Sequence, residues 1–489
     1  MSSLTVIAQY LQLFWPHLVA GGTLVVMLVA SAHLVLYKRD TRAAIGWIAV
    51  IMLVPLLGSI LYALLGINRV QRRAITLRGA PKRLKIAQSG QPAGGEDLVE
   101  KMAPASAHLA ALARLVGALT RRALLPGNRL LPLVGGEQAY REMLTAIDAA
   151  ESSITLSTYI FDNDRTGDRF VESLAGAVER GVEVRVLIDD IGARYTFPSI
   201  VRKLRKSRVT VATFMPTLVR RWFAYSNLRS HRKILVVDGR TGFTGGMNIR
   251  EGEDLSLKPK HPTQDLHFRV EGPVVAHLQE VFAGDWAFAT GELLQGKTWF
   301  PKIEPTGQAL ARGVATGPDE DSNKLRLTLE GAVSCARSSI VVMTPYFLPE
   351  TPLIAALNVA ALRGVEVDII LPEENNLQMV KWASIAQLWQ VLERGCRVWL
   401  TPPPFDHTKL MVVDRAWTFL GSANWDPRSL RLNFEFNVEC YDNTLSDGLH
   451  EWMLSRRKRA RAVTLKDVDG RRLPVRLRDG VVRLFSPYL

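Results

Sequence analysis

Two copies of one motif, H-x-K-x-x-x-x-D, supply the candidate catalytic side chains of this chain: His231, Lys233 and Asp238 in the first copy, and His407, Lys409 and Asp414 in the second. An imidazole can act as a nucleophile or as an acid and base near neutral pH. A lysine supplies a positive charge and hydrogen-bond donors for a phosphoryl oxygen. Packing of the protein core alone does not explain why His, Lys and Asp occur twice in the same order and spacing. The motifs therefore indicate a catalytic site that can hold a phosphoryl group.

Each motif runs through a short apolar segment that is typical of a buried strand. Residues 234–237 and 410–413 are rich in β-branched side chains. On a strand, residues two apart face the same side, so the His and Lys of H-x-K project together into one site. Each Asp lies an odd number of residues beyond its His, off that face unless a turn at Gly239 changes its direction. We keep Asp238 and Asp414 in the candidate set and expect a structural or orienting role for them.

The sequence around the motifs indicates an α/β fold whose pattern occurs twice. The matching segments are residues 152–161 with 338–347, the pentapeptide Arg-Gly-Val-Glu-Val at 180–184 and at 363–367, and the following strands at 185–188 and 368–371. In each copy, a helix pattern lies between the first strand and the Arg-Gly-Val-Glu-Val segment. Strand, helix, strand is the βαβ unit of a parallel-rich sheet. An internal repeat with one motif per copy implies two similar lobes.

Both motifs continue into turns of small residues that end in asparagine, Gly245-Gly246-Met247-Asn248 and Gly421-Ser422-Ala423-Asn424. With these flanks, the chain resembles the phospholipase D superfamily and, within it, the bacterial cardiolipin synthases. The other segments that carry the resemblance are residues 227–233, 425–429, 431–435 and 483–489. Many relatives have Trp shortly before an Asp-x-His element, whereas Gln264-Asp265-Leu266-His267 keeps the Asp and His without Trp. This departure concerns the acceptor or headgroup preference and not the chemistry.

The resemblance implies an α/β fold of two pseudo-symmetric phospholipase D-like lobes, with mixed sheets flanked by helices and the two histidines facing each other across one site. It also implies a two-step phosphatidyl transfer. One histidine, His231 by family analogy, forms a phosphohistidine, and the other acts as acid and then as base. The motif lysines, together with Asn248 and Asn424 as substrate-binding residues, would stabilise the non-bridging oxygens.

The motifs supply their own cations, and the acidic residues show no strong metal-ligand cluster, so we predict no metal and no other cofactor. The cysteines Cys335, Cys396 and Cys440 are far apart and odd in number. They show neither metal-ligand spacing nor a disulfide framework, which indicates ordinary buried thiols in a reducing compartment.

Charge and hydropathy point to a membrane. The chain has 61 Lys and Arg against 47 Asp and Glu, a net charge of +14, which suits an anionic membrane or nucleic acid, although a generally basic soluble surface has the same composition. No charged side chain occurs from Met1 to Tyr37, and residues 14–37 and 43–67 are each long enough to span a bilayer. We predict a two-helix membrane hairpin; a pair of buried core helices is the alternative, and a signal peptide is disfavoured.

These patterns divide the chain into a two-span membrane anchor at 1–68, a basic connector at 69–129, a first lobe at 130–310 and a second lobe at 311–489. The hairpin loop carries Lys38, Arg39 and Arg42, whereas seven lysines and arginines lie between Arg69 and Lys85. The heavier count places the N-terminus and the catalytic region in the cytoplasm. We therefore expect a multi-pass protein of the bacterial inner membrane.

The resulting prediction is a synthase that condenses two phosphatidylglycerol molecules into cardiolipin and glycerol, with other anionic phospholipids as further partners. Two variants of the same chemistry stay open: use of phosphatidylethanolamine as a partner lipid, and hydrolysis to phosphatidic acid. A membrane-tethered nuclease and an inactive membrane scaffold are alternatives from other classes; we expect no nucleic-acid partner. The sequence leaves open the acceptor preference, the oligomeric state and the identity of the nucleophile.

Overall fold

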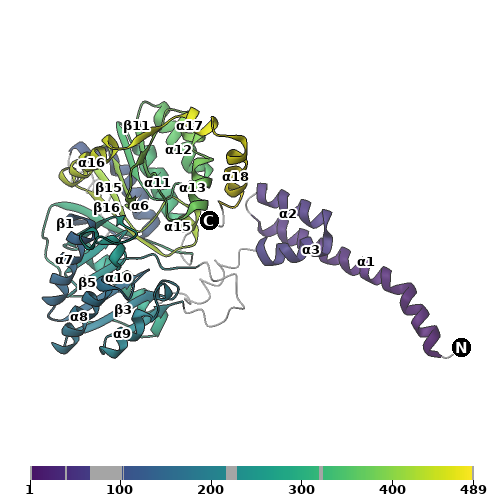
Figure 1. Cartoon of the computed structure of the whole chain (residues 1–489), viewed down its shortest axis with the longest axis horizontal. Coiled ribbons are helices and arrows are strands. Elements are labelled where there is room, and N and C mark those ends of the chain that lie inside the picture. The colour runs from purple at the N-terminus through teal and green to yellow at the C-terminus, as the bar shows by residue number, and fades with distance from the viewer. Residues whose placement is uncertain are drawn as a thin grey trace. The chain divides into compact units, whose positions relative to one another are not determined.

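The computed structural model describes residues 3–38, 41–66, 102, 104–215, 228–318 and 323–486. The chain divides into two compact units (Figure 1): residues 1–77 with 221–226, and residues 78–220 with 227–489. Most of the predicted basic connector, together with Asn227 and the last three residues, lies outside the described residues.

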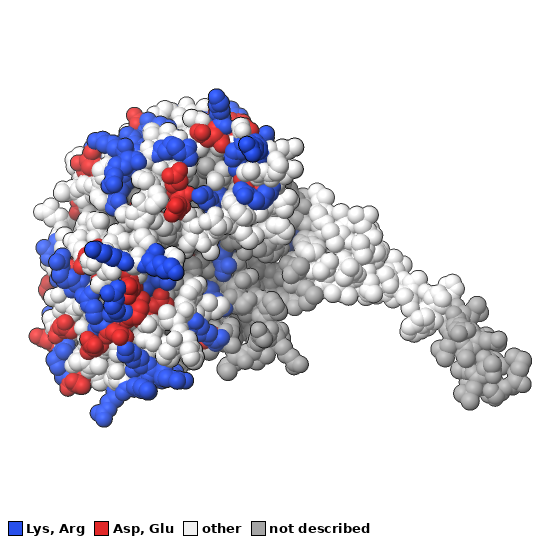
Figure 2. Space-filling view, in the orientation of Figure 1, with Lys and Arg blue, Asp and Glu red and all other residues white. Residues whose placement is uncertain are grey.

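The first unit contains α1 (Ser3–Tyr37), α2 (Thr41–Leu53), α3 (Pro55–Leu61) and the π-helix η1 (Tyr62–Gly66). Within α1, the stretch Phe14–Tyr37 has a mean hydropathy of 2.1 and is long and apolar enough to cross a membrane. Its surface is almost free of charge in Figure 2. A hydrogen bond of 2.9 Å joins His33 Nδ1 of α1 and Tyr62 Oη of η1, and Nζ of Lys38, the residue after α1, donates to the Gly66 carbonyl at 3.0 Å.

The second apolar segment differs from the prediction of one continuous span over residues 43–67. Helix α2 ends at Leu53, and α3 begins at Pro55. Proline has no N–H and disfavours helical geometry in the residue before it, and Val54 accordingly has φ −135° and ψ 75°. Among the described helices, α1 is therefore the one of sufficient length to span a bilayer.

The second unit is built on one mixed sheet of 15 strands. In sheet order the strands are β17 (Arg461–Val463), β12 (Arg397–Thr401), β11 (Glu366–Pro372), β10 (Ser339–Met343), β14 (Leu410–Val413), β15 (Trp417–Gly421), β16 (Glu435–Tyr441), β9 (Ala309–Thr316), β1 (Leu125–Val134), β8 (Leu266–Glu271), β6 (Thr241–Gly245), β5 (Ile234–Val237), β2 (Ser153–Thr158), β3 (Glu183–Asp189) and β4 (Thr210–Phe214). Strands β2, β3 and β4 are parallel to one another, as are β10, β11 and β12, and the other pairings are antiparallel.

The α/β prediction is confirmed, and the mixed pairing expected in the two lobes occurs within one large sheet. Strand β1 pairs with β8 along one edge and with β9 along the other. Residues 129–134 pair with β8, whereas Leu125 and Asn128 pair with β9 across a register shift, so β1 carries the sheet from the first half of the chain into the second.

Helices cover both faces of this sheet (Figure 1). They are α6 (Ala110–Thr120), α7 (Gly135–Asp148), α8 (Arg165–Glu179), α9 (Ile200–Lys206), α10 (Val275–Thr290), α11 (Lys324–Cys335), α12 (Thr351–Leu362), α13 (Gln378–Ile385), α14 (Trp389–Leu392), α15 (Pro427–Arg431), α16 (Asn443–Lys458), α17 (Leu465–Asp469) and α18 (Leu473–Leu484). Leu235 and Val237 of β5 pack with α7 and α8, while Ile234 and Val236 pack with α10 on the other face. This double burial explains why the strand is apolar at every position.

The three cysteines are free thiols, as predicted. Cys396 and Cys440 are buried, and Cys335 is partly exposed.

Candidate active site

The two motif histidines immediately precede the predicted strands. His231 lies three residues before β5, and His407 three residues before β14. Because β5 is antiparallel to β2 and β14 is antiparallel to β10, both histidines lie at the carboxyl ends of the parallel strands. That end of an open α/β sheet is where ligands usually bind.

Backbone hydrogen bonds from the other half of the chain hold each histidine in place. The N–H of His231 donates to the carbonyl of Phe434 at 2.9 Å, and the N–H of His407 donates to the carbonyl of Gln264 at 2.7 Å. Around His407, a two-stranded sheet of β7 (Thr263–Gln264) and β13 (Phe405–Asp406) extends this link. Segments about 150 to 200 residues apart in sequence thus build one site.

Each imidazole also meets a carboxylate from the opposite half of the chain. His407 Nδ1 is hydrogen-bonded to Asp265 Oδ2 at 2.8 Å. His231 Nδ1 lies 3.4 Å from Glu435 Oε1 and 3.1 Å from Asn433 Nδ2. A carboxylate on Nδ1 fixes the orientation of the ring and leaves Nε2 for chemistry.

Sequence reasoning missed these two carboxylates as functional residues. Asp265 was noted only within its Asp-x-His element, and Glu435 only as part of a flank. Their common signal is an acidic residue at the start of a later apolar strand in each half: Asp265 immediately precedes β8, and Glu435 is the first residue of β16. The sequence could not assign them because each serves the histidine of the other half.

The small-residue turns after the motifs accommodate the carboxylates, which explains their composition. Ser422 Oγ and Ser429 Oγ donate to the two oxygens of Glu435, the latter at 2.9 Å. A Cβ at Gly246, which occupies the position of Ser422 in the first turn, would lie 2.5 Å from Asp265 Oδ2. Only glycine leaves room for the carboxylate there.

Both motif lysines donate to the backbone carbonyls of their own histidines, Lys233 to His231 at 2.7 Å and Lys409 to His407. Burial lowers the pKa of Lys233, and it lowers that of Lys409 to about 8. The charges of Asp265 and Glu435 act on both lysines in the opposite direction. Two buried ammonium groups that share the same carboxylates create a site suited to an anion.

The histidines lie in the same field of charge, with 21% of the His231 side chain and 15% of the His407 side chain exposed. Burial lowers the pKa of His407 well below its ordinary value, and the positive charges of Lys409, Lys233 and His231 lower it further. Burial also lowers the pKa of His231, although the charge of Glu435 opposes this shift. Burial raises the pKa of Glu435, but the positive charges of His231 and Lys233 outweigh it, so the net shift is downward.

The two asparagines differ in their surroundings. Asn248 is engaged by the protein: its Nδ2 donates to Glu253 at 3.2 Å, and its Oδ1 accepts from the N–H of Ile160 at 3.2 Å. Asn424 is buried, and its Oδ1 has no hydrogen-bond partner within the described part of the chain. Glu253 is a further residue that the sequence did not reveal; burial, and then the charge of Asp265, raises its pKa to about 8.

The motif aspartates lie at the opposite ends of their strands from the histidines. Each Asp is the seventh residue after its His along a nearly extended chain, roughly 20 Å away. Asp238 accepts from the N–H groups of Glu151, Ser152 and Ser153, the last two at 2.7 and 2.9 Å, and thereby ties the end of β5 to the start of β2.

Asp414 has the same arrangement in the second half of the chain. It accepts from the N–H groups of Arg337, Ser338 and Ser339 and from Nε2 of His108 at 2.6 Å. Both aspartates have a positive φ of 52°, and a turn does occur at Gly239 as the sequence suggested. This geometry fits the structural or orienting role expected for the two aspartates.

Aromatic rings flank both histidines. The ring of Tyr159 lies 4.5 Å from that of His231, and the rings of Phe405 and Tyr346 lie 5.7 and 6.2 Å from that of His407. Tyr195 contacts Tyr159 at 6.2 Å between ring centroids and is half-exposed. These rings form part of the wall around the two imidazoles.

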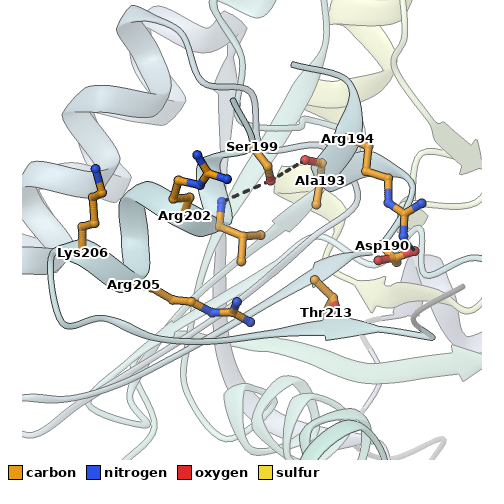
Figure 3. Close-up of a pocket in the computed structure, with 9 residues that line it drawn as sticks. Asp190, Ala193, Arg194, Ser199, Arg202, Arg205, Lys206 and Thr213 are labelled. Carbon is orange, nitrogen blue, oxygen red and sulfur yellow. Dashed lines mark hydrogen bonds and ion pairs between the residues drawn. The ribbon is translucent and has the colours of Figure 1, made fainter. Parts of the chain in front are cut away.

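A basic hollow of about 590 Å³ opens at the carboxyl ends of β3 and β4 (Figure 3). Its cationic lining consists of Arg194, Arg202, Arg205 and Lys206. Arg194 is paired with Asp190 at 2.6 Å, and Arg202 and Lys206 lie one turn apart on α9. The hollow contains neither motif, but it lies at the end of the sheet where His231 precedes β5.

Comparison with known protein families shows to which family this chain belongs. A family model described as cardiolipin synthase, phospholipase D-like domain, matches residues 143–286 and 330–457, and each range contains one motif. The chain belongs to this family. A second model, described as phospholipase D-nuclease N-terminal, matches residues 25–66. The expected resemblance to cardiolipin synthases is therefore confirmed.

Curated members of the cardiolipin synthase family match over nearly the whole chain. The major cardiolipin synthase ClsA of Bacillus subtilis strain 168 is 31% identical, and the match covers 94% of this chain and 97% of that protein. Cardiolipin synthase A of Pseudomonas entomophila strain L48 is 31% identical, with 94% and 96% covered. The crystal structure of the phosphatidylserine synthase of Haemophilus influenzae Rd KW20 has the same fold, with a TM-score of 0.59 at 15% identity over 77% of this chain and 100% of that one.

No group of three or more His, Cys, Asp or Glu side chains that could hold a metal ion occurs in the part of the chain that the structure describes.

Proposed function

We propose that this member of the family is a membrane-anchored phosphatidyltransferase that joins two phosphatidylglycerol molecules into cardiolipin and releases glycerol. The observation that carries the proposal is one buried site in which two imidazoles, each held by a carboxylate of the opposite half, lie with two lysines. Relatives that align over nearly the full length bear the name cardiolipin synthase.

In the first step, Nε2 of one histidine attacks phosphorus, forms an N–P bond and breaks the bond to the glycerol headgroup. The other histidine gives that glycerol its proton. In the second step the same histidine removes the proton from a glycerol hydroxyl of the second lipid, whose oxygen attacks phosphorus and breaks the N–P bond. Lys233 and Lys409 neutralise the non-bridging oxygens, and Asn248 and Asn424 orient them.

Resemblance assigns the attack to His231. The charges within the site do not separate the two roles, because burial lowers the pKa of both His231 and His407. Rapid quenching with labelled phosphatidylglycerol, followed by mapping of the phosphohistidine, distinguishes the two assignments.

The two halves of the α/β unit are proposed to be equivalent lobes at about 130–310 and 311–489. The strand order supports this, because β4-β3-β2-β5-β6-β8-β1 in the first half corresponds in sequence to β12-β11-β10-β14-β15-β16-β9 in the second. Replacing either histidine should then stop turnover completely, since each lobe holds only half of the chemistry.

The His231→Ala and His407→Ala variants should each lose transfer while remaining folded in the membrane. His261→Ala, a change of an exposed histidine before β7, is the control and should keep wild-type activity. Near-wild-type turnover by either motif variant would overturn the shared site.

The N-terminal unit is proposed to form a two-span hairpin that leaves both the N-terminus and the catalytic unit in the cytoplasm of a bacterial inner membrane. The hydrogen bonds of His33 and Lys38 to η1 support a hairpin, and the arginines and lysines after Gly66 support the orientation. A reporter fused after Leu489 should behave as cytoplasmic. Protease access to the catalytic unit from outside intact cells would contradict this topology.

The substrate class follows from charge. Two buried lysines and the basic hollow favour anionic phospholipids, and phosphatidylglycerol is the proposed donor and acceptor. In vesicles of phosphatidylglycerol alone, cardiolipin and glycerol should form in equal amounts, and added glycerol should reverse the reaction because one phosphodiester replaces another. Phosphatidic acid as the main product would indicate a hydrolase, and DNA cleavage without lipid turnover would indicate a nuclease.

A further inference from the structure

Helix α18 carries a row of exposed apolar side chains along one face. Leu473, Leu477, Val481, Leu484 and Phe485 are 67%, 59%, 54%, 73% and 52% exposed. Steps of four, four and three residues keep the four helical side chains on one side of the helix. Single exposed apolar residues are ordinary on protein surfaces, but a contiguous row on one element marks an interaction surface.

The opposite face of α18 is the one that packs against the protein. Val482 lies in a buried cluster with Val380 and Ala383 of α13, and Asp479 is buried and paired with Arg471 and Arg478. Figure 1 shows α18 on the outer side of the second unit, beside α13. The apolar row is therefore held outward by the fold, not left over from a loosely attached helix.

Arginines border the apolar row on both sides. At 100° per residue, Arg476 and Arg483 fall along one border and Arg478 along the other. Arg476 and Arg478 are exposed, and the guanidinium of Arg478 lies 4.0 Å from the ring centroid of Trp382. An apolar stripe between cationic borders is typical of a helix that lies in the plane of a membrane interface, with the arginines at the level of anionic headgroups.

This face lies close to the catalytic site. The cluster that receives Val482 also contains Tyr346, with Phe405 packed against it, and both rings lie beside His407. Leu377 and Met379, at the start of α13, are also exposed, at 49% and 47%. One layer of side chains thus separates α18 from the wall of the site.

We propose that α18 is an interfacial helix that inserts its apolar row into an anionic bilayer and so holds the His407 side of the active site against the lipid surface. The inference rests on the proposed function only in that the substrate is a bilayer lipid. It adds a second attachment point at the far end of the sequence from α1, one that acts at the site itself.

A depth measurement on the full-length protein tests the placement directly. In a Cys335→Ser background, Leu477→Cys labelled with a fluorophore should be quenched by lipids that carry a quencher in their acyl chains, in vesicles of phosphatidylglycerol and phosphatidylethanolamine. Leu362→Cys is the control: Leu362 is 68% exposed at the end of α12, near the start of β11 and the opposite end of the sheet, and should be quenched only from water. Aqueous quenching at residue 477, or protection from both quenchers by a covering protein surface, would overturn the proposal.

Kinetics give a second and independent readout. The Leu477→Gln/Leu484→Gln variant should show a KM several-fold higher on anionic vesicles, with kcat unchanged and with wild-type activity on dispersed short-chain phosphatidylglycerol. Leu293→Gln/Leu362→Gln, at two positions 58% and 68% exposed, is the matched control and should behave as wild type. An unchanged vesicle KM in the α18 variant would contradict the proposal. Loss of all turnover in the wild type would count against the proposed function alone, because the depth measurement needs no reaction.

Discussion

At the scale of single residues, the site depends on carboxylates that hold nitrogen atoms in place. Asp265 and Glu435 reach the Nδ1 atoms of His407 and His231 from the opposite half of the chain. The motif aspartates hold only backbone N–H groups at the far ends of the strands. We therefore propose that the H-x-K part of each motif takes part in the reaction and that its Asp fixes the ends of the strands.

Replacing either site carboxylate by its amide should slow the reaction without weakening lipid binding. We expect kcat to fall roughly 10²–10⁴-fold in Glu435→Gln and Asp265→Asn, because the imidazole loses its oriented proton acceptor. KM should change little. Glu304→Gln, at a solvent-exposed carboxylate paired with Lys302, is the control. A rise in KM at constant kcat would show that these carboxylates bind substrate and do not position the rings.

Glu253 should make the stability of the protein depend on pH. Burial, with the charge of Asp265, raises its pKa from 4.5 to about 8. Since the folded state then binds more protons than the unfolded state between these values, this group lowers stability as pH rises from about 4.5 to 8. Glu253→Gln removes the ionisation, so its melting temperature relative to wild type should increase across this range and level off above it. A constant difference at all pH values would contradict the assignment.

At the scale of elements, the apolar runs of β5 and β14 were predictable because burial on both faces leaves a continuous signal in the sequence. The pairing of β7 with β13, and the contact of His231 with Phe434, were not. These contacts join segments with no shared local pattern, and they depend on how the two halves of the chain meet. The second apolar segment was misjudged in length because composition alone does not register the break at Pro55.

That break places α3 close against α2, and Gly58 makes the approach possible. A Cβ at Gly58 would lie 2.4 Å from the backbone oxygen of Val50, whereas a Cβ at Gly46 in α2 would meet nothing within 4 Å. Gly58→Ala should therefore destabilise the N-terminal unit by about 1–3 kcal/mol. Gly46→Ala, the matched control, should be neutral or slightly stabilising. Thermal unfolding of the full chain in detergent, followed by protease sensitivity near residue 58, measures the difference.

At the scale of the molecule, the continuous sheet makes the two halves one mechanical body around the site. Two fully buried arginines reinforce its middle: Arg232 is paired with Asp285, and Arg312 with Glu439. Arg232 is the variable residue of the first H-x-K, and it also donates to the carbonyls of Thr316 at 3.0 Å and Glu435 at 3.2 Å. The residue between the motif His and Lys thus links the first motif to the strands of the second half.

Removing this arginine should loosen the link between the halves. In Arg232→Met, Asp285 loses its guanidinium partner in a buried environment, and we expect a loss of about 3–5 kcal/mol in the free energy of unfolding. The double variant Arg232→Met/Asp285→Leu should recover part of this loss, because no carboxylate is then left buried without its guanidinium, although the carbonyls of Thr316 and Glu435 still lose their donor. Denaturant unfolding of the wild type, Arg232→Met, Asp285→Leu and the double variant gives the coupling between the two side chains. Equal stability of Arg232→Met and the double variant would show that packing around Arg232, and not its charge, holds the halves together. The activity of each variant should then follow its folded fraction.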